Sequence, residues 1–508
     1  QFRERRPFFG KVLSCMCAPA HTHQRACART RSRIVEMKTL VIAEKPSVAQ
    51  DIVRALTPVA GKFEKHDDHF ENDTHVVTSA VGHLVEIAAP EEFDVKRGKW
   101  SFAHLPVLPP YFDLKPIDKT KSRLSAVVKL AKRKDVTALV NACDAGREGE
   151  LIFRLIEQYA GGKKPLGKPV QRLWLQSMTP QAIRDGFTHL RSDEQMRPLA
   201  DAARSRSEAD WMVGINGTRA MTAFNSRDGG FFLTTVGRVQ TPTLAVVVER
   251  EEKIRQFVSR NYWEVHASFQ AQAGEYPAKW FDPAFKKPTG EAADPEQRAD
   301  RVWTEAQARQ IADASRQQPA RVSEESKPTT QASGLLYDLT SLQREASNRF
   351  GFSARRTLQI AQALYEKYKV LTYPRTDSRF LPDDYLGTVI GTMKTFAQHP
   401  TSKHDAMPHD LIPHAAKALS NNWVRPNRRV FDSSKVSDHF AIIPTGQIPP
   451  KELPEAEQKL FDMVTRRFIA VFFPPAEFEV TTRFTRVEQD CFKSDGKVLR
   501  EAGWLAVY

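Results

Sequence analysis

The segment TALVNACDAGREGELIFRLIEQYA, residues 137–160, has the pattern that decides the fold. The apolar run TALVNAC predicts a buried strand, a polar turn follows it, and ELIFRLIEQYA predicts a helix that Gly161 and Gly162 end. Earlier in the chain, TLVIAE (residues 39–44) predicts a second buried strand, and Pro46 suits the first turn of a following helix. Strands that alternate with helices predict a parallel sheet, whose ligands gather at the carboxyl ends of the strands.

The remainder of the chain has a different mixture of patterns. Residues 186–250 are mostly helical in pattern, and residues 260–330 are β-rich with Pro and Gly between the runs. Ser353 is a plausible N-cap of another helix, and Pro374 ends the regular structure beyond it. Residues 460–508 predict a short helix followed by β-structure. The predicted fold class is therefore multidomain, α/β plus α+β.

Composition sets broad limits. A length of 508 residues is too great for one ordinary core, so several domains are expected. Lys and Arg number 75 against 61 Asp and Glu, and the net charge of +14 favours a polyanionic partner. No apolar run approaches the length that crosses a bilayer. Beyond residue 36 the only cysteines are Cys143 and Cys491, too few for a disulfide framework or a four-ligand zinc site, which fits a reducing cytoplasm.

Residues 1–36 account for part of the positive charge. They carry eight Lys or Arg and two acidic residues, so +6 of the net charge lies there and +8 in the rest. The segment has neither a strand nor a helix period, and Met37 stands directly before the first apolar strand. An Arg-rich, acid-poor leader is compatible with an organelle transit peptide. We favour the alternative that the true start is Met37 and that residues 1–36 form an unstructured extension outside the fold.

Acidic side chains gather at the predicted strand ends. Glu44 ends one strand, and Asp144, Glu148 and Glu150 crowd the turn after the other. Carboxylates that converge at strand ends suit Mg²⁺, which takes hard oxygen ligands and often shares them with phosphate. Acids on a turn are usually just solvated, but two clusters in matched strand–helix units favour a metal site.

A second candidate site lies in YPRTDSR, residues 373–379. A tyrosine hydroxyl that attacks phosphate needs a nearby cation, because its phenolate must form beside a negative ester. Arg375 and Arg379 can supply that charge, and arginine can hold phosphate oxygens through its paired donors. The spacing alone is equally compatible with Tyr373 packing against a helix end.

Weaker signals lie elsewhere. In TTVGRVQTPTL, Gly237 allows close backbone approach and Arg238 can bind a phosphate, although a surface arginine in a turn is common. His439 in SDHFAIIPT is weaker still, because a lone histidine is more often structural than catalytic. Residues 162–168 match most of a P-loop, but Pro169 stands where Ser or Thr should hold Mg²⁺ and the segment follows a helix. ATP binding is not expected there.

Seven segments, taken together and in order, resemble those of type IA DNA topoisomerases. They are VIAEKPS, DAGREGELIFR, TTVGRVQTPTLA, LYDLTSLQREA, ARRTLQIAQALYE, LTYPRTDSR and HFAIIPT. The resemblance extends from Met37 to Tyr508, and the AEKPS form and the missing zinc-ribbon cysteines are more similar to bacterial topoisomerase III than to topoisomerase I. It implies an N-terminal Toprim domain followed by a toroidal core around a DNA-sized hole.

The resemblance also implies a division into domains. The expected segments are a Toprim domain at 37–185, a helical ring-base segment at 186–250, a β-rich hinge or arch segment at 251–330, a nucleophile-bearing domain at 331–459 and a returning hinge segment at 460–508. The chain stops before the last stretch of the family, which completes the base of the ring. A truncated protein is therefore expected, and its capacity for full strand passage is open.

Each candidate residue receives an implied role from the same resemblance. Tyr373 is the expected nucleophile and forms a 5′-phosphotyrosyl bond, while Lys45 protonates the leaving 3′-oxygen. Arg375 is expected to stabilise the attacked phosphate, with Asp377 and His439 as a supporting pair.

Metal and DNA contacts are implied in the same way. The expected Mg²⁺-linked acids are Glu44, Asp144 and Glu148, with Glu44 also in the catalytic set, and the expected DNA contacts are Arg238, Gln240 and Arg379. Many family members have a second acid where this chain has Gly146. That departure favours weaker metal binding or a share for Glu150.

The implied function is ATP-independent breakage of one DNA strand, passage of another and rejoining, which relaxes negative supercoils or decatenates DNA. Single-stranded or underwound DNA is the expected substrate, in a basic groove with stacking aromatics. We expect a monomer in the bacterial cytoplasm, associated with the nucleoid and not with a membrane, with helicase or single-strand-binding proteins as partners.

Three other protein classes each leave part of these motifs unexplained or conflict with the implied chemistry. Another Toprim-containing enzyme, a primase or nuclease, leaves Tyr373 and its surroundings unexplained. A tyrosine recombinase links to the 3′-phosphate and needs no acidic metal site. A non-catalytic single-stranded DNA-binding protein leaves the acid cluster unexplained.

Overall fold

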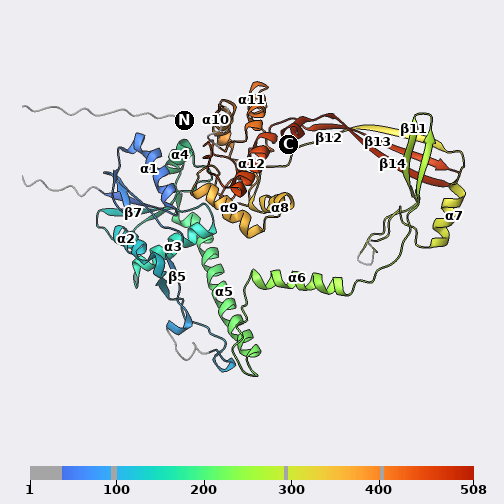
Figure 1. Ribbon diagram of the computed structural model, residues 1–508. Coiled ribbons are helices and arrows are strands. Elements are labelled where there is room, and N and C mark those ends of the chain that lie inside the picture. Colours follow the sequence, from blue (N-terminus) through green and yellow to red (C-terminus); the bar gives the residue numbers. More distant parts are fainter. Residues whose placement is uncertain (1–36, 93–99, 291–293, 295, 401–405) are drawn as a thin grey trace, which may run out of the picture.

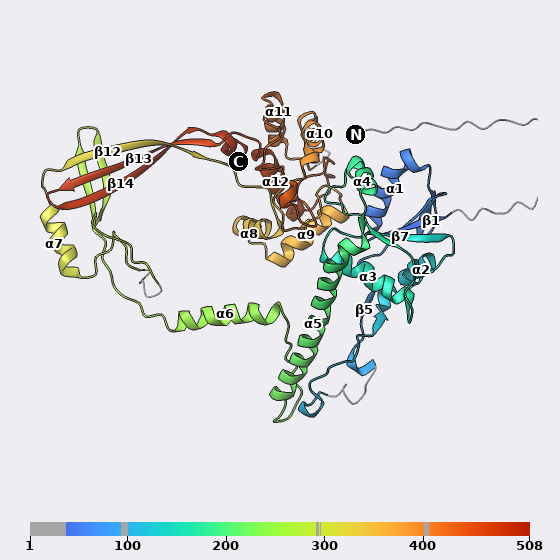
Figure 2. The ribbon, with the colours of Figure 1, turned by 180° about the vertical axis from the view of Figure 1, so that it is seen from behind.

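The structure is a computed structural model that describes residues 37–92, 100–290, 294, 296–400 and 406–508. The predicted extension at residues 1–36 lies outside the described residues. Figures 1 and 2 show an N-terminal lobe around one sheet, a helical lobe beside it, and a remote sheet. Helices join the remote sheet to the N-terminal lobe, and long strands join it to the helical lobe. The chain thus outlines a ring around a hole, as a toroidal core requires.

The N-terminal lobe is built on a seven-stranded sheet in the order β2-β3-β4-β1-β7-β8-β9. Its strands are β1 (Lys38–Ala43), β2 (Glu64–Lys65), β3 (His69–Glu71), β4 (His75–Ser79), β7 (Val136–Ala142), β8 (Val170–Arg172) and β9 (Arg191–Ser192). β1 lies between β4 and β7 and is parallel to both, and β7 is parallel to β8, so the prediction of a parallel sheet is confirmed for these four central strands. The sheet as a whole is mixed, because the pairings β2–β3, β3–β4 and β8–β9 are antiparallel. β9 pairs with β8 although it lies beyond the boundary predicted at residue 185.

Helices cover both faces of this sheet. The elements are α1 (Pro46–Ala60), α2 (Lys121–Ala131), α3 (Arg147–Gly161) and α4 (Pro180–Thr188), with a separate pair of strands, β5 (Val85–Ile87) and β6 (Leu114–Pro116). Successive residues of β1 face opposite ways, so Leu40 packs in the core that holds α2 and α3, and Val41 in the core that holds α1 and α4. Pro46 begins α1, and Gly162, at a φ of 64°, follows the end of α3, as predicted.

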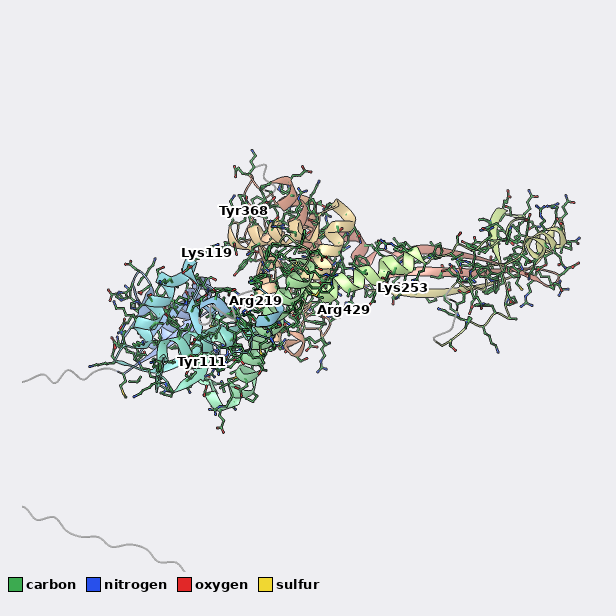
Figure 3. All side chains as sticks on the ribbon, turned by 90° about the horizontal axis from the view of Figure 1, so that it is seen from below. Tyr111, Lys119, Arg219, Lys253, Tyr368 and Arg429 are labelled. Atoms are coloured by element: carbon green, nitrogen blue, oxygen red, sulfur yellow. The ribbon has the colours of Figure 1, made fainter. Side chains whose placement is uncertain are left out.

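Three helices and a remote sheet form the part of the ring that lies away from the two lobes. The elements are α5 (Asp193–Asn225), α6 (Gln240–Arg255), β10 (His266–Ala271), β11 (Gly274–Phe281), α7 (Glu305–Ser315), β12 (Arg321–Gln331), β13 (Ala476–Val487) and β14 (Asp490–Glu501). The remote sheet has the order β10-β11-β14-β13-β12 and is antiparallel throughout. In the view from below, Lys253 on α6 lies between the N-terminal lobe and the remote sheet (Figure 3).

The helical lobe surrounds a large apolar core. Its helices are α8 (Leu339–Phe350), α9 (Ala354–Glu366), α10 (Leu386–Ala397), α11 (Ile412–Ser420) and α12 (Glu455–Ala470). Ser353 caps α9, because its hydroxyl accepts a hydrogen bond from the Arg356 amide. Leu460, Phe461 and Phe468 of α12 fill this core. The helix at the start of the predicted returning segment therefore packs in the helical lobe, and the return to the remote sheet begins at β13.

Short 3₁₀ helices connect these elements. They are η1 (Pro90–Glu92), η2 (Phe102–His104), η3 (Asp118–Thr120), η4 (Asp383–Tyr385), η5 (His409–Leu411), η6 (Ser433–Lys435) and η7 (Gly503–Val507). Cys143 and Cys491 are both buried and free. Among the described residues, no helix has the length and apolar character needed to span a bilayer.

Candidate active site

The acids predicted at the strand ends lie side by side. Ala43, the last residue of β1, is in register with Ala142, the last residue of β7. Glu44 and Asp144 follow closely, and the Asp144 amide donates to Glu44 Oε2 over 3.4 Å. Lys45, the N-cap residue of α1, places its Nζ 2.5 Å from Asp144 Oδ2 and 3.8 Å from Glu44 Oε1. A pair of carboxylates thus shares one ammonium group.

Backbone contacts bring Tyr373 and His439 together in the helical lobe. The Thr372 amide donates to the Ile443 carbonyl over 3.0 Å, and the Thr376 hydroxyl donates to the His439 carbonyl over 2.8 Å. The centroids of the Tyr373 and His439 rings are 4.4 Å apart as a result. Two motifs that are distant in sequence therefore form one surface.

The two lobes meet at these residues. Lys45 Nζ lies 4.1 Å from the centroid of the Tyr373 ring, and His439 Nε2 lies 3.0 Å from Asp144 Oδ2. A cleft of about 490 Å³ opens at this junction, and its lining includes Lys45, Asp144, Tyr373, Asp438 and His439. A potential nucleophile, a cation and acidic groups face the same space.

Burial and charge act on the Tyr373 hydroxyl in opposite directions. Burial raises its pKa above the ordinary value, while the positive charges of Lys45 and Arg375 oppose that rise. Burial alone would lower the pKa of Lys45, but the carboxylates of Asp144 and Glu44 outweigh it and hold that pKa above the ordinary value. Lys45 therefore carries its positive charge at neutral pH.

The pKa values of the Asp144 and Glu44 carboxylates shift in opposite directions at the junction. Burial acts to raise the pKa of Asp144, but hydrogen bonding and charge from His439 and Lys45 hold it at about 2. Burial and the neighbouring charge of Asp144 raise the pKa of Glu44. A cation bound between them would favour the ionised form of Glu44.

A buried arginine supports the turn after β7. Arg172 is 1% exposed and donates to the carbonyl oxygens of Asn141 and Asp144 over 2.9 and 2.5 Å. Glu150 is fully buried, accepts hydrogen bonds from Asn141 and Arg154, and lies 3.4 Å from Arg172 Nε. Because position 146 has no acid, Glu150 was predicted as a substitute metal ligand. Its carboxylate is instead engaged in these structural contacts with Asn141, Arg154 and Arg172.

A second cleft, of about 620 Å³, borders the first. Both clefts are lined by Gln176, Asp438 and His439. Arg375 is exposed in the second cleft, and Asp377 accepts a hydrogen bond from the Ser437 hydroxyl there. The predicted supporting pair, Asp377 and His439, therefore lies in one region, although each side chain has a different partner.

Glu148 lies apart from the other two predicted metal ligands. Its side chain is 63% exposed, and its Oε1 lies 2.5 Å from His83 Nε2. Glu148 therefore joins Glu44 and Asp144 only if its side chain changes partner.

The predicted DNA contacts lie outside the Tyr373 cluster. Arg238 precedes α6 and pairs with Asp210 of α5 over 2.5 Å, while Gln240 is the first residue of α6 and is exposed. Arg379 Nε donates to the Leu336 carbonyl over 3.1 Å, so part of its guanidinium group supports the helical lobe. None of the three lines either cleft at the junction.

A different histidine and acid cluster lies near β3. Ligand atoms of His66, His69 and Glu71 lie within 4.8 Å of one another. Lys38 and Arg133 already bind both carboxylate oxygens of Glu71. In the structure Glu71 is therefore part of an ion-pair network.

Three residues at the junction were missed from the sequence. Asp438 directly precedes His439, Gln176 donates its amide to the backbone just before Asp438, and the Tyr365 ring lies 5.4 Å from the Tyr373 ring between centroids. An acid beside a candidate histidine was a usable signal for Asp438. Gln176 had no such signal, because its partner comes from the other lobe.

Comparison with known proteins identifies the family. The family model described as DNA topoisomerase matches residues 194–508, and the Toprim domain model matches residues 39–178. The chain belongs to the type IA DNA topoisomerases. The N-terminal lobe of this topoisomerase is a Toprim domain, a kind of domain that generally binds a divalent metal ion.

Relatives of this topoisomerase are of the topoisomerase III type. DNA topoisomerase 3 of Bacillus cereus is 40% identical over 474 residues, which are 93% of this chain and 59% of that protein. The Bacillus licheniformis protein of the same name is 39% identical over 474 residues, with 93% and 60% covered. That of Bacillus subtilis is 37% identical over 473 residues, again with 93% and 60% covered. The chain spans about three-fifths of the length of these relatives.

A solved structure shows the same fold. Full-length topoisomerase I from Thermotoga maritima matches with a TM-score of 0.55 at 19% identity, over 92% of this chain and 67% of that chain. The topoisomerase fold predicted from the sequence is confirmed.

Proposed function

We propose that this topoisomerase cuts one DNA strand with Tyr373, allows another strand to pass, and reseals the break without ATP. The observation that carries the proposal is the position of Lys45, which contacts both the Tyr373 ring and the Asp144 carboxylate across the junction of the lobes. A nucleophile and a charged proton donor then face one cleft. Relaxation of negative supercoils and decatenation are the proposed results.

The proposed cleavage is a transesterification. The Tyr373 hydroxyl gives its proton to water, its oxygen bonds to phosphorus, and the bond between phosphorus and the 3′-oxygen breaks. Lys45 donates a proton to that 3′-oxygen, so one proton leaves the tyrosine and one reaches the leaving group. The products are a 5′-phosphotyrosine and a free 3′-hydroxyl. Resealing reverses these steps, and because the ester retains the bond energy, no ATP is needed.

Positive charge in the second cleft supports attack on a phosphodiester. Arg375 lines this cleft with Arg147 and Arg206. Guanidinium groups bind phosphate oxygens through paired donors, so the cleft suits the scissile phosphate and its neighbours. We assign Arg375 to stabilisation of the attacked phosphate, because its charge also acts on the Tyr373 hydroxyl.

Asp377 and His439 are proposed to position reacting groups. Asp377 accepts from the Ser437 hydroxyl, and His439 pairs with Asp144 while its ring contacts Tyr373. Through these contacts the two side chains hold the loop at residues 436–439 against the Tyr373 segment.

The proposed metal ion is Mg²⁺, held by Glu44 and Asp144 with Glu148 as a further ligand. The first two residues fit a cation, because their carboxylates already share the Lys45 ammonium at 3.8 and 2.5 Å. Carboxylate oxygens at strand ends are ligands that Mg²⁺ prefers. When bound, Mg²⁺ would supply positive charge that helps to position the returning 3′-hydroxyl for resealing.

The proposed substrate is single-stranded or underwound DNA, contacted by Arg238, Gln240 and Arg379. Arg238 and Asp210 form an exposed ion pair, which salt screens and a DNA phosphate can replace. We further propose a monomer that acts at the nucleoid in the cytoplasm, with helicase or single-strand-binding proteins as partners.

The proposal is tested by incubating the protein with a single-stranded oligonucleotide labelled at its 3′ end and then denaturing the mixture. The protein should retain the 5′ end of the broken strand and therefore the label. Transfer of label only from a 5′-labelled strand would indicate a tyrosine recombinase. Cleavage without an adduct would indicate a Toprim nuclease, and binding without cleavage would indicate a non-catalytic protein.

A further inference from the structure

Gly146 lies against a carboxylate from the other lobe. Its φ of −158° and ψ of −178° are extended, a conformation that any residue adopts, so the backbone does not require glycine there. A Cβ added to Gly146 would lie 2.1 Å from Asp438 Oδ2 and 2.3 Å from Asp438 Cγ. The Asp438 carboxylate therefore occupies the space into which a side chain at position 146 would project.

Position 146 is the middle of the acidic turn after β7. Asp144 precedes it by two residues and Glu148 follows it by two, so an acid at 146 would stand between two predicted metal ligands. The chain has no side chain there, and a carboxylate from the helical lobe fills the place. We propose that Asp438 supplies, across the lobe junction, the metal-binding carboxylate that position 146 lacks. This inference rests on the metal site of the proposed function.

Contacts on both sides of Asp438 hold it in this position. Gln176 Nε2 of the Toprim domain donates to the carbonyls of Val436 and Ser437 over 2.5 and 3.3 Å. On the other side, His439 Nε2 lies 3.0 Å from Asp144 Oδ2. The loop is thus bound to the Toprim domain immediately before and immediately after Asp438.

The Asp438 carboxylate is also available to a cation. Within the part of the chain that the structure describes, it accepts no hydrogen bond and forms no ion pair. The negative charges of Asp144 and Asp377 repel the Asp438 carboxylate, while the charges of His439 and Arg172 attract it, and a bound cation would relieve the repulsion. Asp438 lines both clefts, so a metal beside it can also meet phosphate oxygens. The metal site would then be complete only while the two lobes are in contact.

Metal binding to the whole chain without DNA tests the inference. Mn²⁺ is titrated and the free ion is followed by electron paramagnetic resonance, with Mg²⁺ as the competitor. Asp438→Asn should weaken Mn²⁺ binding about tenfold or more, because it removes one anionic ligand with little change in shape. The matched control Asp67→Asn changes an exposed acid of the Toprim domain and should leave the affinity unchanged. An affinity of Asp438→Asn within twofold of the unmodified chain would overturn the proposal.

Moving the carboxylate provides a second, independent test. Gly146→Asp alone should lower the melting temperature, because its Cβ cannot coexist with Asp438 in the present positions. Gly146→Asp combined with Asp438→Ala removes the clash and returns an acid to the same space. This double variant should bind Mn²⁺ several-fold more tightly than Asp438→Ala alone. If the folded double variant binds no better than Asp438→Ala, the proposal is wrong even where Asp438→Asn is unstable.

The oligonucleotide assay separates this inference from the function on which it rests. A chain that forms the 5′-phosphotyrosine adduct but binds Mn²⁺ independently of Asp438 keeps the proposed function and loses the inference. A chain that forms no adduct loses the proposed function, whatever its metal affinity.

Discussion

Lys45 Nζ lies 4.1 Å from the centroid of the Tyr373 ring, although the two residues belong to different lobes. The contact exists only while the Toprim domain and the helical lobe are together. A lysine from one lobe therefore acts electrostatically on a tyrosine of the other, and separation of the lobes would remove both the cation and the acids from Tyr373. This relationship makes the proposed chemistry testable one residue at a time.

Tyr373→Phe should abolish covalent DNA adducts and leave single-strand binding nearly unchanged, because it removes only the hydroxyl. Denaturing gels would measure the adducts, and fluorescence anisotropy the binding. Tyr365→Phe is the matched control, because Tyr365 lines the same cleft and its ring lies 5.4 Å from that of Tyr373 between centroids. The assignment of the nucleophile fails if Tyr373→Phe forms adducts at the level of the unmodified chain.

Chelation should impair resealing more than cleavage, because the proposed metal chiefly positions the returning 3′-hydroxyl. Adducts would be formed in EDTA and quantified, and rejoined strands would then be measured after Mg²⁺ is added back. Equal loss of both steps in EDTA would mean that the metal organises the whole site.

Asp144→Asn should shift the alkaline limb of the cleavage rate to lower pH. Asp144 and Glu44 hold the pKa of Lys45 above its ordinary value against the effect of burial. Without the Asp144 charge, less negative charge opposes the effect of burial on Lys45, so the pKa of Lys45 falls. Lys45 then loses its proton, and with it the ability to protonate the 3′-oxygen, at a lower pH. Single-turnover adduct formation in EDTA from about pH 8 to about pH 12 would measure this effect, because the pKa of Lys45 in the unmodified chain lies above the ordinary lysine value.

Asp384→Asn is the control for this pH measurement. Asp384 accepts hydrogen bonds from Ser177 and Thr179 at the same lobe junction and is not among the groups with the largest effects on the pKa of Lys45. Its pH profile should match that of the unmodified chain. An unshifted alkaline limb in Asp144→Asn would show that Lys45 is not the titrating donor.

Glu150→Gln should lower the free energy of unfolding of the Toprim domain by about 3–5 kcal/mol, because a buried arginine loses its charged partner. Glu150 is fully buried beside Arg172, which is 1% exposed. Urea denaturation followed by circular dichroism would measure the loss. Glu157→Gln, on the same helix and 27% exposed, should cost far less. Equal effects of the two substitutions would show that the Arg172 network does not depend on the Glu150 charge.

Much of the local structure could be predicted because its signals act over a few residues. The apolar runs of β1 and β7, Pro46 at the start of α1 and Ser353 before α9 each depend on neighbours within one or two turns. The seven motifs in their order also indicated the protein family, and the family resemblance then assigned roles to Tyr373 and to the acids at the strand ends.

The sequence by itself determined which elements form and which residues are chemically able to act, because propensity and residue type are local properties. Only the tertiary structure decided which of them meet. Glu150 is buried against Arg172, and Asp438 fills the space beside Gly146, through contacts between distant segments. Such contacts depend on how helices and loops pack across a lobe junction, and no short window of sequence carries that information.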